Sequence, residues 1–146
     1  MIAARVQIPG LRGEPVIARA HVINPLTFYG KPFEECRRAI AAAKERMAGL
    51  ADAAGRGAVI VGGDINSTPN MRQFRDLLSN GYRDAVEQTG AGSVPPFPSY
   101  PVFPTLVTID HVLTRHATVS SIRTIDLPGS DHRALLATVE LPRGHP

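Results

Sequence analysis

The chain has 146 residues, of which 43% are hydrophobic, and it carries a formal net charge of +3 at pH 7. This length and composition are typical of one soluble globular domain, and the charge is too small for the basic tail of a dedicated nucleic-acid binder. No apolar stretch is long enough to span a bilayer, the opening residues lack the features of a signal peptide, and the single cysteine excludes an internal disulfide.

The first part of the chain predicts a β-hairpin followed by a long helix. Residues 3–9 and 15–23 are rich in Val and Ile and are separated by the turn-forming sequence GLRGE. The helix should end near residues 55–57, where two glycines accept a positive φ. Its buried face is indicated by apolar residues at amphipathic spacing: Cys36, Ile40, Ala43, Met47 and Leu50. This spacing favours a buried thiol over a reactive one.

A buried strand and a second helix are predicted next. The sequence AVIVGGD at residues 58–64 is a short continuous apolar run, which is typical of a central strand covered on both faces. Beyond it, apolar residues at helical spacing predict a shorter helix from about residue 70 to Gly81, with an inner face formed by Phe74, Leu77 and Leu78.

The last third of the chain predicts an irregular loop and three strands. Residues 90–104 carry too many prolines to donate ladder hydrogen bonds, and loops of this length are often functional. The runs at residues 106–114, 118–126 and 134–141 are strand-like. The expected order is therefore two strands, a helix, a strand, a helix and three strands, and no interior linker divides the chain.

Three short motifs place polar residues at or within strands. GDIN carries Asp64 and Asn66 where the buried strand stops, although such residues also make ordinary helix caps. IDH puts Asp110 in the middle of an apolar strand, where a buried carboxylate needs a partner or must bond loop backbone. SDHR puts Asp131 beside His132 in a tight loop, which in isolation is a polar turn.

Taken together and in this order, GDIN, IDH and SDHR resemble the second half of the endonuclease/exonuclease/phosphatase superfamily, which includes deoxyribonuclease I and the abasic-site endonucleases. The segment ARAHVINP, which carries His21, resembles the histidine-bearing strand of the deoxyribonuclease I-like branch. The resemblance covers residues 16–141. It implies an α+β fold that is part of a two-sheet α/β sandwich, with residues 1–146 as the C-terminal part of a single domain whose N-terminal half is missing.

The resemblance also implies a metal-dependent hydrolase of phosphoester bonds in the full-length form. Asp64 would orient or deprotonate the attacking water, and Asn66 would donate hydrogen bonds to the phosphoryl oxygens. His132 would contact the phosphate as base or cationic stabiliser, with Asp110 fixing its tautomer. His21 would protonate the leaving group.

Metal and further substrate contacts follow from the same resemblance. Asp131 and Asp64 would bind magnesium or another divalent cation such as manganese, because oxygen ligands are present and no Cys/His cluster suggests zinc. Arg133 is a candidate phosphate contact, with a solvated loop arginine as the alternative. His111 receives no catalytic role, because it follows Asp110 and so points to the opposite sheet face. His116 and His145, in a turn and a terminal tail, receive none either.

Complete members of the superfamily begin with a half that supplies an asparagine and a glutamate, and that glutamate is the main metal ligand. The only acid before His21 is Glu14, which lies in the predicted hairpin turn. We therefore expect the isolated segment to bind magnesium weakly or not at all, and its activity without that half is open. The missing half would also leave an apolar sheet face open, interrupted by Arg5, Gln7 and Arg19, and we predict a homodimer through this face.

Two other functions compete with the enzyme. A catalytically inactive half-domain that acts as a binding or interaction module would not require the five motif residues together. A sequence-specific nucleic-acid binder lacks support, because the chain has no recognition-helix motif and no stripe of Lys and Arg interleaved with aromatics. The substrate is open among nucleic acid, phospholipid and sugar phosphate, since fold does not select among them. The sequences HVLTRH and DLPGSDHRALLATVEL are most similar to membrane-attached bacterial members whose domain faces outward.

Overall fold

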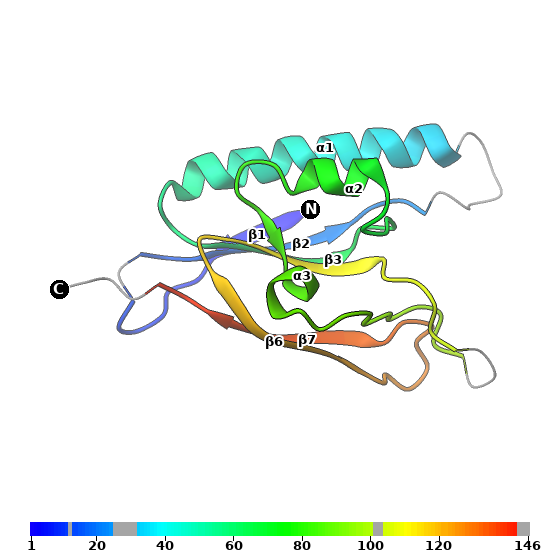
Figure 1. Cartoon of the computed structure of the whole chain (residues 1–146). Helices are drawn as coiled ribbons and strands as arrows, with labels where there is room; N and C mark the ends of the chain where they lie inside the picture. Colours follow the sequence, from blue (N-terminus) through cyan, green and yellow to red (C-terminus); the bar gives the residue numbers. More distant parts are fainter. Residues whose placement is uncertain (12, 25–31, 101–103, 143–146) are drawn as a thin grey trace.

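Helices, a five-stranded sheet and a two-stranded sheet are stacked in layers in the computed structural model, which describes residues 1–11, 13–24, 32–100 and 104–142. Helices α1 and α2 cover one side of the larger sheet, and the smaller sheet lies on its other side (Figure 1). In chain order the elements are β1 (Ile2–Arg5), β2 (Val16–His21), α1 (Pro32–Ala54), β3 (Val59–Asp64), α2 (Arg72–Leu77), β4 (Arg83–Asp84), α3 (Ala85–Thr89), β5 (Asp110–Arg115), β6 (Thr118–Ile125) and β7 (Ala134–Glu140).

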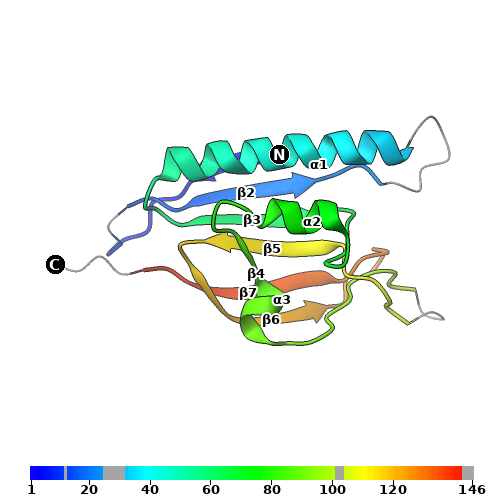
Figure 2. The same cartoon turned by 45° about the horizontal axis from the view of Figure 1, so that its top comes forward.

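The larger sheet has the strand order β1-β2-β3-β5-β4. Strands β2 and β3 run parallel and are joined by α1, whereas β1 and β5 are antiparallel to their neighbours. Figure 2 shows β2, β3 and β5 side by side beneath α1 and α2. The predicted N-terminal hairpin and the predicted central strand are both confirmed.

The main core lies between this sheet and α1. Strand β2 alternates, so that Val16, Ala18 and Ala20 are buried while the residues between them are exposed. The predicted helical face is buried against them, and it includes Cys36 at 3% exposure. Burial raises the pKa of the Cys36 thiol, which favours its neutral form. The prediction of a buried rather than reactive cysteine is confirmed.

The second sheet pairs β6 with β7 and packs on β5 and α3. Its small core centres on Ala85, Val119 and Ile122. The mixed α+β architecture with two sheets is the predicted fold class. Sequence reasoning missed β4 and α3, although Asp84 and Glu87 stand in the order of a capping box and the Asp84 side chain accepts from the Val86 N–H at 2.7 Å.

Strand β5 begins at Asp110 rather than at residue 106. The preceding stretch is held by the proline-rich loop instead of the sheet, because Val107 forms an isolated bridge with Phe97. Apart from this bridge, the described residues from 91 to 100 form no helix or strand, as predicted. Asp110 therefore stands half-buried at the end of the strand, and the expectation that it lies in the middle of the strand is wrong.

The face of β1 and β2 that points away from α1 is open to solvent. Ile2 is 75% exposed and Ile17 is 43% exposed on this face. Arg19 lies there too, because it is the register partner of Ile2 and stands two residues after Ile17 on β2. The predicted exposed apolar residues are therefore present. Among the described residues, no helix combines the length and apolar character that crossing a membrane requires.

Candidate active site

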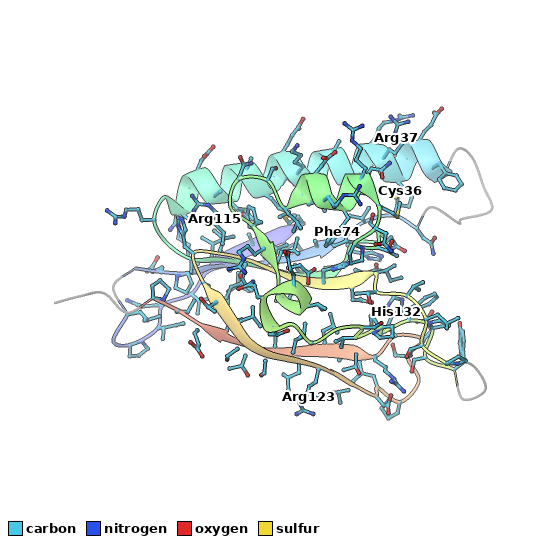
Figure 3. All side chains as sticks on the ribbon, viewed as in Figure 1. Cys36, Arg37, Phe74, Arg115, Arg123 and His132 are labelled. Atoms are coloured by element: carbon cyan, nitrogen blue, oxygen red, sulfur yellow. The ribbon has the colours of Figure 1, made fainter. Side chains whose placement is uncertain are left out.

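A cleft of about 370 Å³ lies at the end of β2 and β3 where β5 begins. Its polar lining comes from four separate segments and consists of Arg19, His21, Asp64, Asp110, Ser130, Asp131 and His132. The motif order predicts that Asp64, Asn66, Asp131 and His132 converge on one end of the sheet; Asp64, Asp131 and His132 line this cleft, whereas Asn66 does not. Figure 3 shows His132 at this end of the molecule, between the start of β5 and the start of β7.

Strand register aligns three of these side chains. His21 on β2 is the partner of Asp64 on β3, and Asp64 is the partner of Asp110 on β5. Directly paired residues project from the same face of a sheet. The row formed by His21, Asp64 and Asp110 is thus a consequence of the βαβ crossover followed by an antiparallel return strand.

The close approach of β2 and β3 at this end depends on Gly63. Its φ is +142°, and a Cβ there would lie 2.0 Å from the carbonyl oxygen of Ala20. No side chain fits at that distance, so only glycine allows the strand to carry Asp64 beside His21. The second glycine of the GGD sequence is therefore a geometric requirement of the site.

His132 is held by Asp110. The Nδ1 atom of His132 lies 2.7 Å from Oδ2 of Asp110, and the His132 backbone N–H donates to Ser130 Oγ at 3.1 Å. The side chains are 25% and 18% exposed. The ring also packs on Phe97, with the ring centroids 4.7 Å apart. Since Nε2 makes no hydrogen bond with any described residue, it is available to the cleft. The predicted pair is confirmed, and its role is taken up below.

Asp64 is fixed by Asn66. The Asn66 backbone N–H donates to Oδ1 at 2.7 Å, and its Nδ2 donates to Oδ2 at 2.9 Å and to the Val22 carbonyl at 2.8 Å. Asn66 is 7% exposed and has a φ of 49°, a left-handed conformation that asparagine tolerates. Both Nδ2 hydrogens are therefore engaged within the protein.

The pKa of Asp64 is raised above the ordinary value of 3.8. Burial is the main cause; the Asn66 N–H lowers the pKa, the Asp110 carboxylate raises it, and His132 and His21 lower it. The His21 contribution is purely electrostatic, because its Nε2 lies 4.0 Å from Asp64 Oδ2 and its side chain is 61% exposed. An aspartate whose pKa is raised is a stronger base than an ordinary aspartate.

Candidate metal ligands surround the same point. Within the described ranges, Asp64, Asp110 and His132 offer ligand atoms that all lie within 4.8 Å of one another. Asp131, which the sequence predicted as a ligand with Asp64, lines the cleft but is exposed and is not part of this group. Asp64 and Asp110 are adjacent carboxylates, and burial together with Asp110 destabilises the charged form of Asp64. Such a pair suits a hard divalent cation.

Arg133 is not in this cleft. Its Nε lies 2.7 Å from Asp126 Oδ1, and it lines a neighbouring cleft of about 760 Å³ together with Tyr100. Arg19 lines the cleft with His132 instead. Sequence reasoning treated Arg19 only as an interruption of the apolar face. The signal for its position was available, because Arg19 precedes His21 by two residues and so shares its strand face.

The proline-rich loop supports the SDHR segment from outside. The Ser99 N–H donates to the Asp131 carbonyl at 2.8 Å, and the Arg133 N–H donates to the Pro96 carbonyl at 2.9 Å. With Phe97 packed on the ring of His132, this loop forms one wall of the site.

His111 points to the opposite face, as predicted, and takes part in a second histidine–aspartate pair. Its Nδ1 lies 2.7 Å from Asp84 Oδ2, and its Nε2 lies 2.9 Å from the Ser67 carbonyl. The ring packs on that of Phe74, with the centroids 4.1 Å apart and the planes tilted by 36°, and Figure 3 shows Phe74 between the helices and the sheet. Sequence reasoning missed this pair, because the partner lies in the unrecognised β4.

The sequence matches the model of the Endonuclease/Exonuclease/phosphatase family over residues 3–132. No curated protein matches the chain in sequence.

Solved structures with the same fold are similar to the chain at low identity. A 3'-5' exonuclease from Neisseria meningitidis shares 17% identity at a TM-score of 0.72, over 91% of this chain and 62% of that one. An endonuclease/exonuclease/phosphatase from Bacteroides vulgatus shares 21% identity at a TM-score of 0.64, over 89% of this chain and 51% of that one. A mannosyl-6-phosphatase from Bacteroides thetaiotaomicron shares 15% identity at a TM-score of 0.60, over 90% of this chain and 52% of that one. The chain thus spans between 51% and 62% of the length of these structures.

Proposed function

The chain belongs to the endonuclease/exonuclease/phosphatase family, and we propose that it forms the C-terminal part of a single metal-dependent phosphoester hydrolase domain. One observation carries this proposal. His132 is oriented by Asp110 at 2.7 Å, keeps its Nε2 available, and lies in one cleft with Asp64. An oriented imidazole beside a carboxylate with a raised pKa supplies the two proton-handling groups that hydrolysis needs.

We assign the chemistry as follows. Asp64 orients the attacking water and accepts its proton as the new P–O bond forms. His132 donates a hydrogen bond from Nε2 to a phosphoryl oxygen that gains charge, while Asp110 keeps the ring in position. The bond to the leaving oxygen breaks, and His21, exposed at the rim, supplies the proton that this oxygen needs.

Asn66 acts first as a positioning residue in this scheme. Its Nδ2 hydrogens hold Asp64 and the Val22 carbonyl. Direct donation to a phosphoryl oxygen requires Asn66 to give up its 2.9 Å hydrogen bond to Asp64. We propose that this exchange accompanies substrate binding, so that Asn66 releases Asp64 as the phosphate arrives.

The cofactor we propose is magnesium, or another divalent cation such as manganese. The carboxylates of Asp64, Asp110 and Asp131 face one cleft and provide the oxygen ligands that such cations prefer. A bound cation would neutralise charge on the phosphoryl group. Burial raises the pKa of Asp64, which means that its charged form is destabilised. A bound cation would stabilise that charged form, and this is the structural reason for expecting a cation here.

The substrate is proposed to be a phosphoester, carried by a nucleic acid, a phospholipid or a sugar phosphate. Among the similar structures, one is a 3'-5' exonuclease and another is a mannosyl-6-phosphatase. We also propose that the full-length protein is a bacterial membrane-attached member whose domain faces outward, on the similarity of its C-terminal strands to such proteins.

A catalytically inactive binding module is the second candidate. It is favoured by the cleft lining, to which no described residue before His21 adds an acid: Glu14, in the segment between β1 and β2, is exposed and does not line the cleft. The test is hydrolysis of bis(p-nitrophenyl) phosphate and p-nitrophenyl phosphate by the full-length protein, with and without magnesium or manganese. Cation-dependent hydrolysis is expected. A folded full-length protein that binds the cation and hydrolyses neither ester would favour the binding module.

We further propose a homodimer through the open face of β1 and β2. Ile2 and Ile17 are exposed there, and exposed apolar surface costs about 25 cal/mol per Å². A second copy packed about a two-fold axis would cover Ile2 and Ile17 of both copies at once and leave both partial active sites near the edge of the sandwich. Sedimentation at micromolar concentration should show a dimer that Ile17→Lys converts to a monomer. A stable monomer before substitution would refute this assembly.

A further inference from the structure

The charges in the catalytic cleft are unbalanced. Three of its lining residues are aspartates, whereas its only arginine or lysine among the described residues is Arg19. A phosphate group that enters this cleft meets carboxylates that repel it. Since guanidinium groups bind phosphate oxygens in a bidentate manner, Arg19 is the side chain best able to offset that repulsion.

The strand geometry directs Arg19 into the cleft. Its neighbours Ala18 and Ala20 are 3% and 2% exposed and face α1, so Arg19 projects from the same face as His21. It is the register partner of Gly62, just as His21 is the partner of Asp64. Arg19 therefore lies one side-chain step, about 6 to 7 Å, farther along the cleft floor than His21.

The space beside Arg19 is empty because its neighbour is a glycine. A Cβ at Gly62 would meet no atom within 4 Å. Unlike Gly63, Gly62 does not have a positive φ, so its backbone conformation does not require glycine. The missing side chain leaves room over β3 for an anion between Arg19 and the row of catalytic side chains.

Arg19 is also unengaged. It forms no hydrogen bond or ion pair with any residue that the structure describes, although carboxylates line the same cleft. Some other arginines are held: Arg5 donates to the Ala53 carbonyl, Arg115 donates to the carbonyls of Asn80 and Gly55, and Arg133 pairs with Asp126. Its guanidinium thus retains all of its donors for a ligand.

We propose that Arg19, rather than Arg133, binds the phosphate group of the substrate through its non-bridging oxygens, and that Gly62 keeps the adjoining floor of the cleft open. This inference rests on the proposed function, because it assigns a substrate contact within the same site. It places the phosphate over β2 and β3, between the Arg19 guanidinium and Nε2 of His132.

The test measures binding of inorganic phosphate to the full chain by calorimetry and by amide NMR shifts, with magnesium present. Arg19→Ala should weaken binding about tenfold or more, because hydrogen bonds to charged groups are worth at least such a factor. Arg19→Lys should recover part of the loss, since it keeps the charge and loses the planar fork. Gly62→Val should weaken binding with Arg19 still present, because its side chain fills the empty floor.

Arg123→Ala is the matched control, because Arg123 is an exposed strand arginine outside the cleft (Figure 3). Its phosphate affinity should stay within about twofold of the unchanged chain, within the spread expected for a surface change. The proposal is overturned if Arg19→Ala binds phosphate as well as the unchanged chain. It is equally overturned if Arg133→Ala loses more affinity than Arg19→Ala, or if the unchanged chain binds no phosphate.

Hydrolysis separates this inference from the proposed function. Arg19-dependent phosphate binding without hydrolysis would count against the enzyme and support the role of Arg19. Hydrolysis by Arg19→Ala with an unchanged KM would overturn the role of Arg19 and leave the enzyme standing. An increased KM with a smaller change in kcat is the result expected if both proposals hold.

Discussion

Two histidine–aspartate pairs lie on opposite faces of β5, and they differ in one respect that decides what each can do. In both pairs Nδ1 of the histidine lies 2.7 Å from Oδ2 of the aspartate. His132 and Asp110 face the cleft with side chains 25% and 18% exposed. His111 and Asp84 face the helices with side chains 0% and 6% exposed.

The difference lies in the second ring nitrogen. Nε2 of His132 has no partner among the described residues, whereas Nε2 of His111 is bonded to the Ser67 carbonyl at 2.9 Å. A histidine with both nitrogens occupied has nothing left to exchange with a substrate. The pairing with aspartate is therefore no mark of catalysis in itself, and access to the remaining nitrogen separates the two roles.

The largest expected effect comes from His132→Ala. We expect it to reduce cation-dependent hydrolysis by about 10²- to 10⁴-fold, the range of general acid–base and related proton-handling contributions. The free energy of unfolding should hardly change, because the ring is partly exposed. Steady-state kinetics and urea unfolding measure the two quantities.

The control for His132→Ala is His116→Asn, which changes an exposed histidine in the left-handed conformation, at a φ of 53°, to a residue that tolerates it. Equal activity in His132→Ala and the unchanged chain would assign the chemistry to other groups.

His111→Ala should show the opposite pattern. It leaves Asp84 buried without its partner, and breaking a buried pair in this way costs about 3–5 kcal/mol. Urea denaturation should show this loss, and Phe74 should lose its stacking partner at the same time. A His111→Ala chain as stable as the unchanged one would mean that the two pairs do not differ as described.

Asp84→Asn sharpens the comparison by removing charge while keeping a capping residue. Asparagine still accepts from the Val86 N–H, so α3 should keep its cap. The weakened bond to His111 should cost about 1–3 kcal/mol, less than His111→Ala. If both changes reduce the free energy of unfolding equally, the cost comes from losing the charged pair itself, because both variants keep the cap of α3.

The smallest effect is the pH dependence that Asp64 confers on stability. Burial and the neighbouring Asp110 raise its pKa above 3.8, more than the Asn66 N–H and the two histidines lower it. A carboxyl group with a raised folded-state pKa stabilises the fold fully below its ordinary pKa, and this contribution is lost as the pH rises through the raised value. Stability relative to Asp64→Asn should therefore fall as the pH rises above 3.8. Urea unfolding over a pH series measures it, and parallel curves for the two chains would contradict it.

Much of the fold was predictable because its long helices and strands show a clear periodicity of apolar residues in the sequence. The face of α1 that carries Cys36 and Met47 and the continuous apolar run of β3 are both long enough to be recognised. In contrast, β4 has two residues and α3 has five, so neither is long enough to show a period. Strand β5 was placed too early because a bridge between Phe97 and Val107 depends on a contact that sequence alone does not specify.

The site was predictable where motif residues follow strand ends. The pairing of Asp110 with His132 and the position of Asp64 follow from motif order. The partner of His111 did not follow, because Asp84 lies 27 residues away and nothing local distinguishes it from other acids. Alternation alone could place Arg19 beside His21, but the room it needs is provided by Gly62 on a different strand.

The attachment of the proline-rich loop to the SDHR segment has a consequence for redesign. Backbone hydrogen bonds join Ser99 to Asp131 and Arg133 to Pro96, so the two stretches of main chain hold each other on either side of His132. A loop grafted from another protein to change substrate preference must therefore bring the acceptor and donor at these positions with it. Exchange of residues 93–107 alone would displace the imidazole, and selectivity and turnover would then change together rather than independently.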